Sequence, residues 1–248
     1  RRLGGAPMIA AAGHLQWWLD TNVIAALRRK APMNDIQGIL FDADGTLIDT
    51  YDIILTSMRY AINDVLGRDL PDDALMAGVG TPLRDQMVGF AEGDEALAEH
   101  LLTTYREHNV AVHDAQVRAF PDTRAALERM RAAGIPMAVV TSKRHALAER
   151  GLAMSGIAEF LPVRIGPDDW PEHKPAPGPL LRACELMGLD ATRCLYVGDS
   201  PFDIQAGNAA GCTTVAALWG MFSAEALAAE NPTIMCASLS AMVERLSL

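Results

Sequence analysis

Residues 39–50 read ILFDADGTLIDT, an apolar run that ends in two aspartates, Asp42 and Asp44. The run is typical of a buried β-strand, which we expect over residues 36–41. Two carboxylates at the end of such a strand repel each other and resist desolvation. Because side chains two positions apart in an extended chain project to the same side, both point toward one place. The stretch therefore predicts a core strand that presents a pair of acids to a site.

Strand-like apolar runs and amphipathic helical patterns alternate from Ile36 to the end of the chain. This alternation is typical of βαβ units, which build a doubly wound α/β fold with helices on both faces of a parallel sheet. The expected strands are residues 36–41, 135–140, 162–165, 194–197, 213–217 and 233–236. The expected helices are residues 122–133, 144–154, 177–187, 202–210, 223–230 and 238–246.

Residues 51–121 form a gap too long for one crossover, and they have helical periodicity with little strand signal. The stretches YDIILTSMRYAINDVL (51–66) and DEALAEHLLTTYREHNVAVH (94–113) repeat apolar residues every three or four positions. We expect a small helical bundle over the carboxyl edge of the sheet, where open α/β sheets bind ligands. It is either a lid over a site or a helical decoration.

Polar side chains follow the expected strands, and in a parallel sheet these ends converge on one edge. They are Asp42, Asp44 and Thr46, then Thr141 and Ser142, then Lys174 in a loop before a helix, and finally Asp199, Ser200 and Asp203. Each cluster alone has a structural explanation, such as a helix cap or a solvated loop charge. Their joint occurrence at strand ends favours a functional site.

Four carboxylates in one site require a cation, and an oxygen-rich set suits Mg²⁺. Lys174 supplies a fixed positive charge and Thr141 a hydroxyl donor. Gly45 and Thr46 are expected to add backbone donors in the turn after Asp44. Together these groups predict a place for a phosphoryl group.

The composition excludes some partners. A net charge of −10 argues against a nucleic-acid partner, and it means that a local cation must hold any anionic ligand. The four cysteines form no C-x-x-C pair, so we expect reduced thiols in a cytoplasmic protein rather than disulfides or a zinc site.

Residues 1–35 are expected to be an extension of unknown role. Polar residues interrupt the apolar stretch at 8–27, which falls short of a membrane span, and a signal peptide is poorly matched. An accessory helix, a cloning remnant and an upstream extension all fit this stretch. We expect no membrane partner.

DADGT (42–46), VVTSK (139–143), HKPAP (173–177) and GDSPFD (198–203) resemble the four motifs of the haloacid dehalogenase superfamily. The resemblance covers residues 36–248. It implies a Rossmann-like core, residues 36–50 and 122–248, with an inserted α-helical cap of the first class at 51–121.

The resemblance also implies roles for individual residues. Asp42 would be the nucleophile that forms an aspartyl-phosphate, and Asp44 the general acid and base. Thr141 and Lys174 would bind the phosphoryl group, with Ser142 and Lys143 near the substrate. The Mg²⁺ ligands would be Asp42, the backbone carbonyl of Asp44 and Asp199, with Asp203 binding through water or orienting Lys174.

Within the superfamily, the second acid at Asp44 argues against dehalogenation and leaves a phosphatase. DGTLIDT, TSK and Trp219-Gly220 look like the phosphoglycolate phosphatase group, whereas YREHNVAVHD (105–114) resembles the cap of a bacterial pyrophosphatase branch. His108 and His113 in that stretch are either near the substrate or on the helix surface. Arg84 is a candidate for holding a substrate anion.

The expected function is therefore a Mg²⁺-dependent phosphatase for a small phosphorylated metabolite, acting as a monomer or homodimer. Inorganic pyrophosphatase is the alternative enzyme. A non-enzymatic phosphoacceptor domain is a distant alternative, because such domains lack an acid two residues after the acceptor and a cap of this length.

Overall fold

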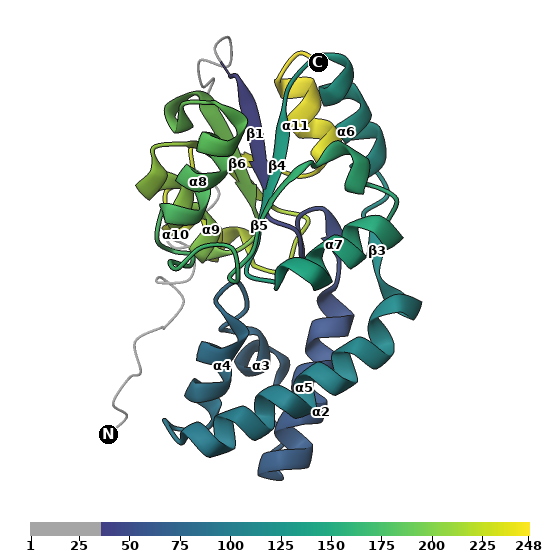
Figure 1. Ribbon diagram of the computed structural model, residues 1–248, viewed down its shortest axis with the longest axis vertical. Helices are drawn as coiled ribbons and strands as arrows, with labels where there is room; N and C mark the ends of the chain where they lie inside the picture. Colours follow the sequence, from purple (N-terminus) through teal and green to yellow (C-terminus); the bar gives the residue numbers. More distant parts are fainter. Residues whose placement is uncertain (1–35) are drawn as a thin grey trace, which may run out of the picture.

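The computed structural model describes residues 36–248 and contains a six-stranded parallel sheet of order β5-β4-β1-β6-β7-β8 (Figure 1). The expected strands are confirmed, as is the doubly wound α/β fold. The expectation for residues 1–35 concerns a segment outside the described residues. The strands are β1 (Gly38–Phe41), β4 (Met137–Val140), β5 (Val163–Ile165), β6 (Cys194–Gly198), β7 (Thr213–Ala217) and β8 (Ile234–Cys236).

Alternate side chains of each strand enter different apolar layers, because successive residues of a strand face opposite sides of the sheet. Ile39 and Phe41 pack in one layer, and Leu40 packs in the other. The first layer is covered by α6 (Thr123–Ala132), α7 (His145–Met154) and α11 (Leu239–Arg245). The opposite face carries α8 (Gly178–Met187), α9 (Pro201–Ala210) and α10 (Ala224–Ala229).

Strand β1 lies in the centre of the sheet, between β4 and β6. The chain order reverses around it, which makes its carboxyl end the switch point where ligands bind in open α/β sheets. The amide of Asp42 donates to the carbonyl of Val197 at 2.9 Å, so the backbone stays aligned with β6 one residue beyond the strand. This alignment holds the Asp42 side chain at the sheet edge.

The inserted helices lie beyond that edge and have an apolar cluster of their own (Figure 1). They are α2 (Tyr51–Leu66), α3 (Asp72–Met76), α4 (Leu83–Phe90) and α5 (Glu95–Gln116). Helices α2 and α5 form the main packing pair. Within residues 36–248, no helix combines the length and the apolar character needed to cross a membrane.

Two short strands join the core to these helices, and the sequence did not predict them. Strand β2 (Ile48–Asp49) pairs antiparallel with β3 (Arg118–Ala119) where the chain leaves the core and returns to it. The hydroxyl of Thr123 and the amide of Phe120 both donate to the carbonyl of Leu47. A two-residue strand is too short to show an alternating pattern, which explains why it was missed.

Candidate active site

The amine of Lys174 lies between two carboxylates at the carboxyl edge of the sheet. Its Nζ is 2.6 Å from Oδ1 of Asp203 and 3.0 Å from Oδ1 of Asp42, and all three side chains are buried. Burial by itself lowers the pKa of Lys174, but the two carboxylates outweigh it and hold the pKa above its ordinary value. A permanent positive charge therefore stands beside the end of β1.

Protein donors already occupy both oxygens of Asp203. Oδ1 accepts from Lys174 and, at 2.9 Å, from the hydroxyl of Tyr196. Oδ2 accepts from the amide and the hydroxyl of Ser200, at 3.0 and 2.6 Å, in the capping box that begins α9. A carboxylate offers about four lone-pair positions, so this one is saturated. Its geometry suits holding Lys174 in place more than binding a metal directly.

Asp199, which follows β6, keeps open positions. Its Oδ1 accepts from the hydroxyl of Thr46 at 3.0 Å, and its Oδ2 accepts from the amide of Met221 at 2.7 Å. Burial, followed by neighbouring carboxylates, raises the pKa of Asp199 well above its ordinary value. Gly45 passes close by with φ 79°, and a Cβ there would lie 2.2 Å from Oδ2 of Asp199. Only glycine allows this turn.

Asp42, Asp199 and Asp203 are the one set of metal-ligating side chains in residues 36–248 whose ligand atoms lie within 4.8 Å of one another. Oδ1 of Asp42 is buried, and Nζ of Lys174, 3.0 Å away, is its one partner among residues 36–248. Burial raises the pKa of Asp42 to about 7, against the opposing effect of Lys174. A buried set of hard oxygen donors fits Mg²⁺, and Asp42 and Asp199 carry the open positions.

Asp44 belongs to a second ion pair on the outer side of this cluster. Its Oδ1 lies 2.7 Å from Nζ of Lys143 and accepts from the hydroxyl of Thr50 at 2.8 Å. The side chain stands outside the three-carboxylate set. The two aspartates of the DADGT motif therefore have different surroundings, one against a buried lysine and one at the boundary with the inserted helices.

The loop before α4 (residues 77–82, here called the cap loop) contacts Ser142, which follows β4 in the core. The hydroxyl of Ser142 donates to the carbonyl of Gly80 at 2.6 Å. Gly80 has φ 103°, and a Cβ there would lie 2.7 Å from Oγ of Ser200. The hydroxyl of Ser142 thus binds the cap loop, and its expected contact with the substrate stays a prediction.

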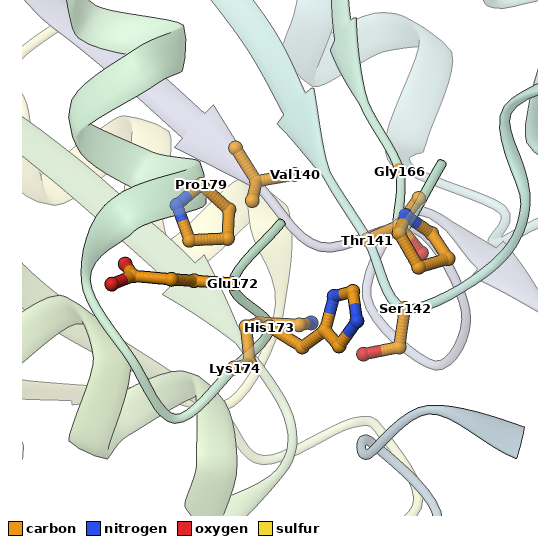
Figure 2. A pocket seen from close by; sticks show the side chains of 9 residues that line it. Val140, Thr141, Ser142, Gly166, Glu172, His173, Lys174 and Pro179 are labelled. Carbon is orange, nitrogen blue, oxygen red and sulfur yellow. The ribbon is translucent and has the colours of Figure 1, made fainter. Parts of the chain in front are cut away.

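Thr141 and Lys174 line a small cavity of about 10 Å³, close to the volume that one water needs. In Figure 2, Thr141 and Ser142, which follow β4, lie across it from Glu172 and His173 of the loop before α8. The Thr141 hydroxyl accepts from the amide of Lys143 at 3.2 Å, so its hydrogen remains available to a ligand.

A larger groove of about 470 Å³ opens between the cap and the core. Its cap side is lined by Gly78, Thr81, Pro82, Asp85 and Gln86, and its core side by His173, Lys174 and Pro175. It connects the solvent with the loop that carries Lys174.

The backbone donors expected from Gly45 and Thr46 are not available. The amide of Gly45 donates to Ile48 at 2.8 Å, and that of Thr46 donates to Ala43 at 3.3 Å. The turn that lets the chain leave β1 uses both groups. Within residues 36–248, the amides of Ala43 and Asp44 have no protein acceptor, so they are the donors that the turn leaves open.

The three cap residues considered as substrate contacts have partners within the cap and at its base. Arg84 is exposed and forms ion pairs with Glu95 and Glu99, so these carboxylates already neutralise its charge. His113 is buried at the base of the cap rather than on a helix surface, and His108 stacks on Tyr60 with ring centroids 4.6 Å apart. Within residues 36–248, neither histidine forms a hydrogen bond or an ion pair with Asp42, Asp199 or Asp203.

Sequence reasoning missed Tyr196 and Thr50. Tyr196 looks like an ordinary apolar strand residue, although a buried phenol needs a hydrogen-bond partner, which was the available signal. Thr50 gave no signal, because its role depends on how α2 leaves the core.

Comparison with known proteins identifies the family. The model for haloacid dehalogenase-like hydrolases matches residues 39–217. The pyrophosphatase PpaX of Oceanobacillus iheyensis is 34% identical over 197 residues, which cover 79% of this chain and 90% of that protein. The pyrophosphatase PpaX of Bacillus cereus is 32% identical over 212 residues, covering 86% and 97%.

Among solved structures, that of a predicted phosphoglycolate phosphatase from Haemophilus somnus aligns with a TM-score of 0.75 and 25% identity. The alignment covers 85% of this chain and 97% of that one. The matched residues 39–217 include all four motifs, DADGT, VVTSK, HKPAP and GDSPFD, the third of which contains Lys174. The chain belongs to the haloacid dehalogenase-like hydrolases.

Proposed function

We propose that this protein is a Mg²⁺-dependent phosphatase that hydrolyses a small phosphorylated metabolite through an aspartyl-phosphate on Asp42. The observation that carries the proposal is the placement of Lys174 between Asp42 and Asp203, with Asp44 and Asp199 at the same sheet edge. A fixed cation beside a carboxylate lets that carboxylate approach an anionic phosphoryl group.

In the first step, an oxygen of Asp42 attacks phosphorus while the bond from phosphorus to the leaving oxygen breaks. Asp44 gives its proton to that oxygen as the bonding electrons move onto it. Lys174, the Thr141 hydroxyl and the free amides of Ala43 and Asp44 would hold the phosphoryl oxygens.

In the second step, water attacks the phosphorus of the aspartyl-phosphate. Asp44, now ionised, takes the proton from that water, and inorganic phosphate leaves while the Asp42 carboxylate is restored. Lys143 and Thr50 hold the Asp44 carboxylate in place for both transfers. Two acids with separate hydrogen-bond partners can thus perform separate roles.

Asp42 and Asp199 would hold Mg²⁺ through their open positions, and Asp203 would orient Lys174. Bound there, the ion would neutralise charge on the phosphoryl group. Thr46 supports this arrangement because its hydroxyl fixes Asp199. We therefore assign Thr46 to the metal site rather than to the substrate.

Two substrates deserve direct comparison. The names of the sequence relatives favour pyrophosphate, and that of the structural neighbour favours 2-phosphoglycolate. The site favours an enzyme over a non-enzymatic phosphoacceptor domain, because Asp44 can activate the water that hydrolyses the aspartyl-phosphate. We also propose a cytoplasmic enzyme, since all four cysteines are buried free thiols. We expect a monomer or a homodimer.

The test is release of inorganic phosphate from a panel of phosphorylated metabolites and pyrophosphate. We expect release with Mg²⁺ and none with EDTA. Asp42→Asn should abolish it without unfolding the protein, whereas Asp49→Asn, a change at an exposed aspartate nearby, should not. Substantial activity of Asp42→Asn would contradict the mechanism, and failure on every substrate would contradict the function.

A further inference from the structure

The Trp219-Gly220 pair begins a loop whose role the proposed function leaves unexplained. This loop, residues 219–222, reads WGMF and lies between β7 and α10; we call it the WGMF loop. All four of its residues are half-buried. The loop contacts the surroundings of Asp199 through its backbone and its tryptophan, and the cap through two other side chains.

The backbone of the WGMF loop holds one oxygen of Asp199. The amide of Met221 donates to Oδ2 of Asp199 at 2.7 Å. At Gly220 the chain passes so close that a Cβ would lie 2.2 Å from Cβ of Asp199 and 2.5 Å from its Oδ2. A side chain at position 220 would displace the carboxylate, so this close approach requires glycine.

The indole of Trp219 supports the other oxygen of Asp199 through Thr46. Its Nε1–H donates to the carbonyl of Thr46 at 2.9 Å, and the Thr46 hydroxyl donates to Oδ1 of Asp199 at 3.0 Å. The two hydrogen bonds that Asp199 accepts within residues 36–248 thus both involve the WGMF loop, one directly and one through Thr46. Groups that orient a metal ligand in this way contribute to the affinity for the metal.

The side chains of Met221 and Phe222 belong to the apolar packing of the cap. Both pack against the apolar cluster of the cap, and among the described residues they are the two members of that cluster from outside the cap. Phe222 also packs against the core cluster that contains Ile204 and Leu227. Met221 therefore holds Asp199 with its amide and contacts the cap with its side chain.

We infer that the WGMF loop couples Mg²⁺ binding at Asp199 to the packing of the cap, with Met221 and Phe222 as positioning residues. The inference rests on the proposed function, because Asp199 is assigned there to Mg²⁺. Packing of the cap on these two side chains holds the loop against Asp199. By thermodynamic linkage, an ion that binds better when the cap is packed also strengthens that packing.

The first test measures Mg²⁺ affinity without substrate, by isothermal titration. Met221→Ala removes the contact with the cap and keeps the amide that holds Asp199. This variant should raise the Kd for Mg²⁺ about fivefold or more. Met221→Leu keeps most of the side-chain volume and should retain an affinity close to that of the wild-type protein.

Leu66→Ala is the matched control, because Leu66 is also half-buried against the apolar cluster of the cap. It is the last residue of α2, at the end of that helix away from the core and about 22 Å from its first residue (Figure 1). This variant loses similar cap packing but should keep the wild-type Kd. Urea unfolding in EDTA checks that both alanine variants are folded.

The second test uses the reverse direction of the coupling. Mg²⁺ should slow hydrogen exchange of the cap helices in the wild-type protein, and this effect should be largely lost in Met221→Ala. Cap exchange that is insensitive to Mg²⁺, an unchanged Kd in Met221→Ala, or an equal loss of affinity in Leu66→Ala would each overturn the inference while leaving the phosphatase intact. No Mg²⁺ binding by the wild-type protein would overturn the proposed metal site together with the inference.

Discussion

Nζ of Lys174 lies 2.6 Å from Oδ1 of Asp203, and both side chains are almost entirely removed from water. The pair joins the loop before α8 to the first turn of α9. Asp203 also accepts from Tyr196 and Ser200, so one carboxylate connects a strand, a helix cap and Lys174. Lys174 then remains charged and directed at Asp42.

Asp203→Asn should destabilise the protein by about 3–5 kcal/mol and lower kcat. An amide cannot replace the negative charge, so a buried lysine loses its main partner. Its NH₂ group also cannot accept from both Ser200 donors. Urea denaturation and phosphate release measure the two effects.

Asp94→Asn provides the comparison for that variant, because Asp94 is an exposed N-cap of α5 and asparagine caps a helix equally well. Its free energy of unfolding should change by less than about 0.5 kcal/mol. A similarly small loss in Asp203→Asn would show that the ion pair does not hold Lys174.

Thr46→Val should weaken Mg²⁺ affinity about 10- to 100-fold, because it removes the hydroxyl that orients Asp199 and keeps the side-chain volume. Isothermal titration of the metal, without substrate, measures the change. Thr56→Val, on the exposed side of α2, should leave the affinity unaltered. A variant that raises KM for substrate but binds Mg²⁺ normally would return Thr46 to the substrate site.

Stability without Mg²⁺ should fall as pH rises from about 4 to 7. Burial raises the pKa of Asp42 from its ordinary 3.8 to about 7, so the folded protein holds a proton that the unfolded chain has released. The raised pKa of Asp199 acts in the same direction. Lys174 is charged in both states across this window and adds no slope. The loss from Asp42 is at most about 4 kcal/mol.

Urea unfolding at several pH values in EDTA and in Mg²⁺ checks this dependence. Saturating Mg²⁺ should reduce the slope, because the ion binds the deprotonated carboxylates. Asp42→Asn should flatten the EDTA curve. Stability that instead increased toward pH 7 in EDTA would mean that Asp42 is ionised in the metal-free protein.

Gly80→Ala should lower kcat by roughly tenfold to a hundredfold, because a Cβ would push the cap loop away from Ser200 and misplace it. Gly93→Ala separates this effect from backbone strain. Gly93 has φ 88° and free space around it, so the left-handed backbone should lower the free energy of unfolding of both variants by about 1–2 kcal/mol. Equal kinetic losses in the two variants would show that the Gly80 contact is not needed for catalysis.

Much of the fold could be predicted because its signals are local. The six strands and the core helices have clear periodicities, and the predicted boundaries differ from those observed by at most two residues. The β2–β3 pair escaped notice because Ile48 and Asp49 gain strand geometry only when Arg118 and Ala119 return beside them. The ion pairs of Arg84 with Glu95 and Glu99 escaped notice because these carboxylates follow on another helix.

By itself the sequence determined that Asp42, Asp44, Thr141, Lys174 and Asp199 meet at one edge, because parallel strands carry their carboxyl ends to the same side of a sheet. Only the tertiary structure decided how these groups divide their work. Asp203 is saturated by Tyr196 and Ser200, whereas Asp199 stays open, and this difference depends on donors brought together by folding. Hydrogen bonds such as that of Thr46 to Asp199 join positions 153 residues apart, and no local pattern records them.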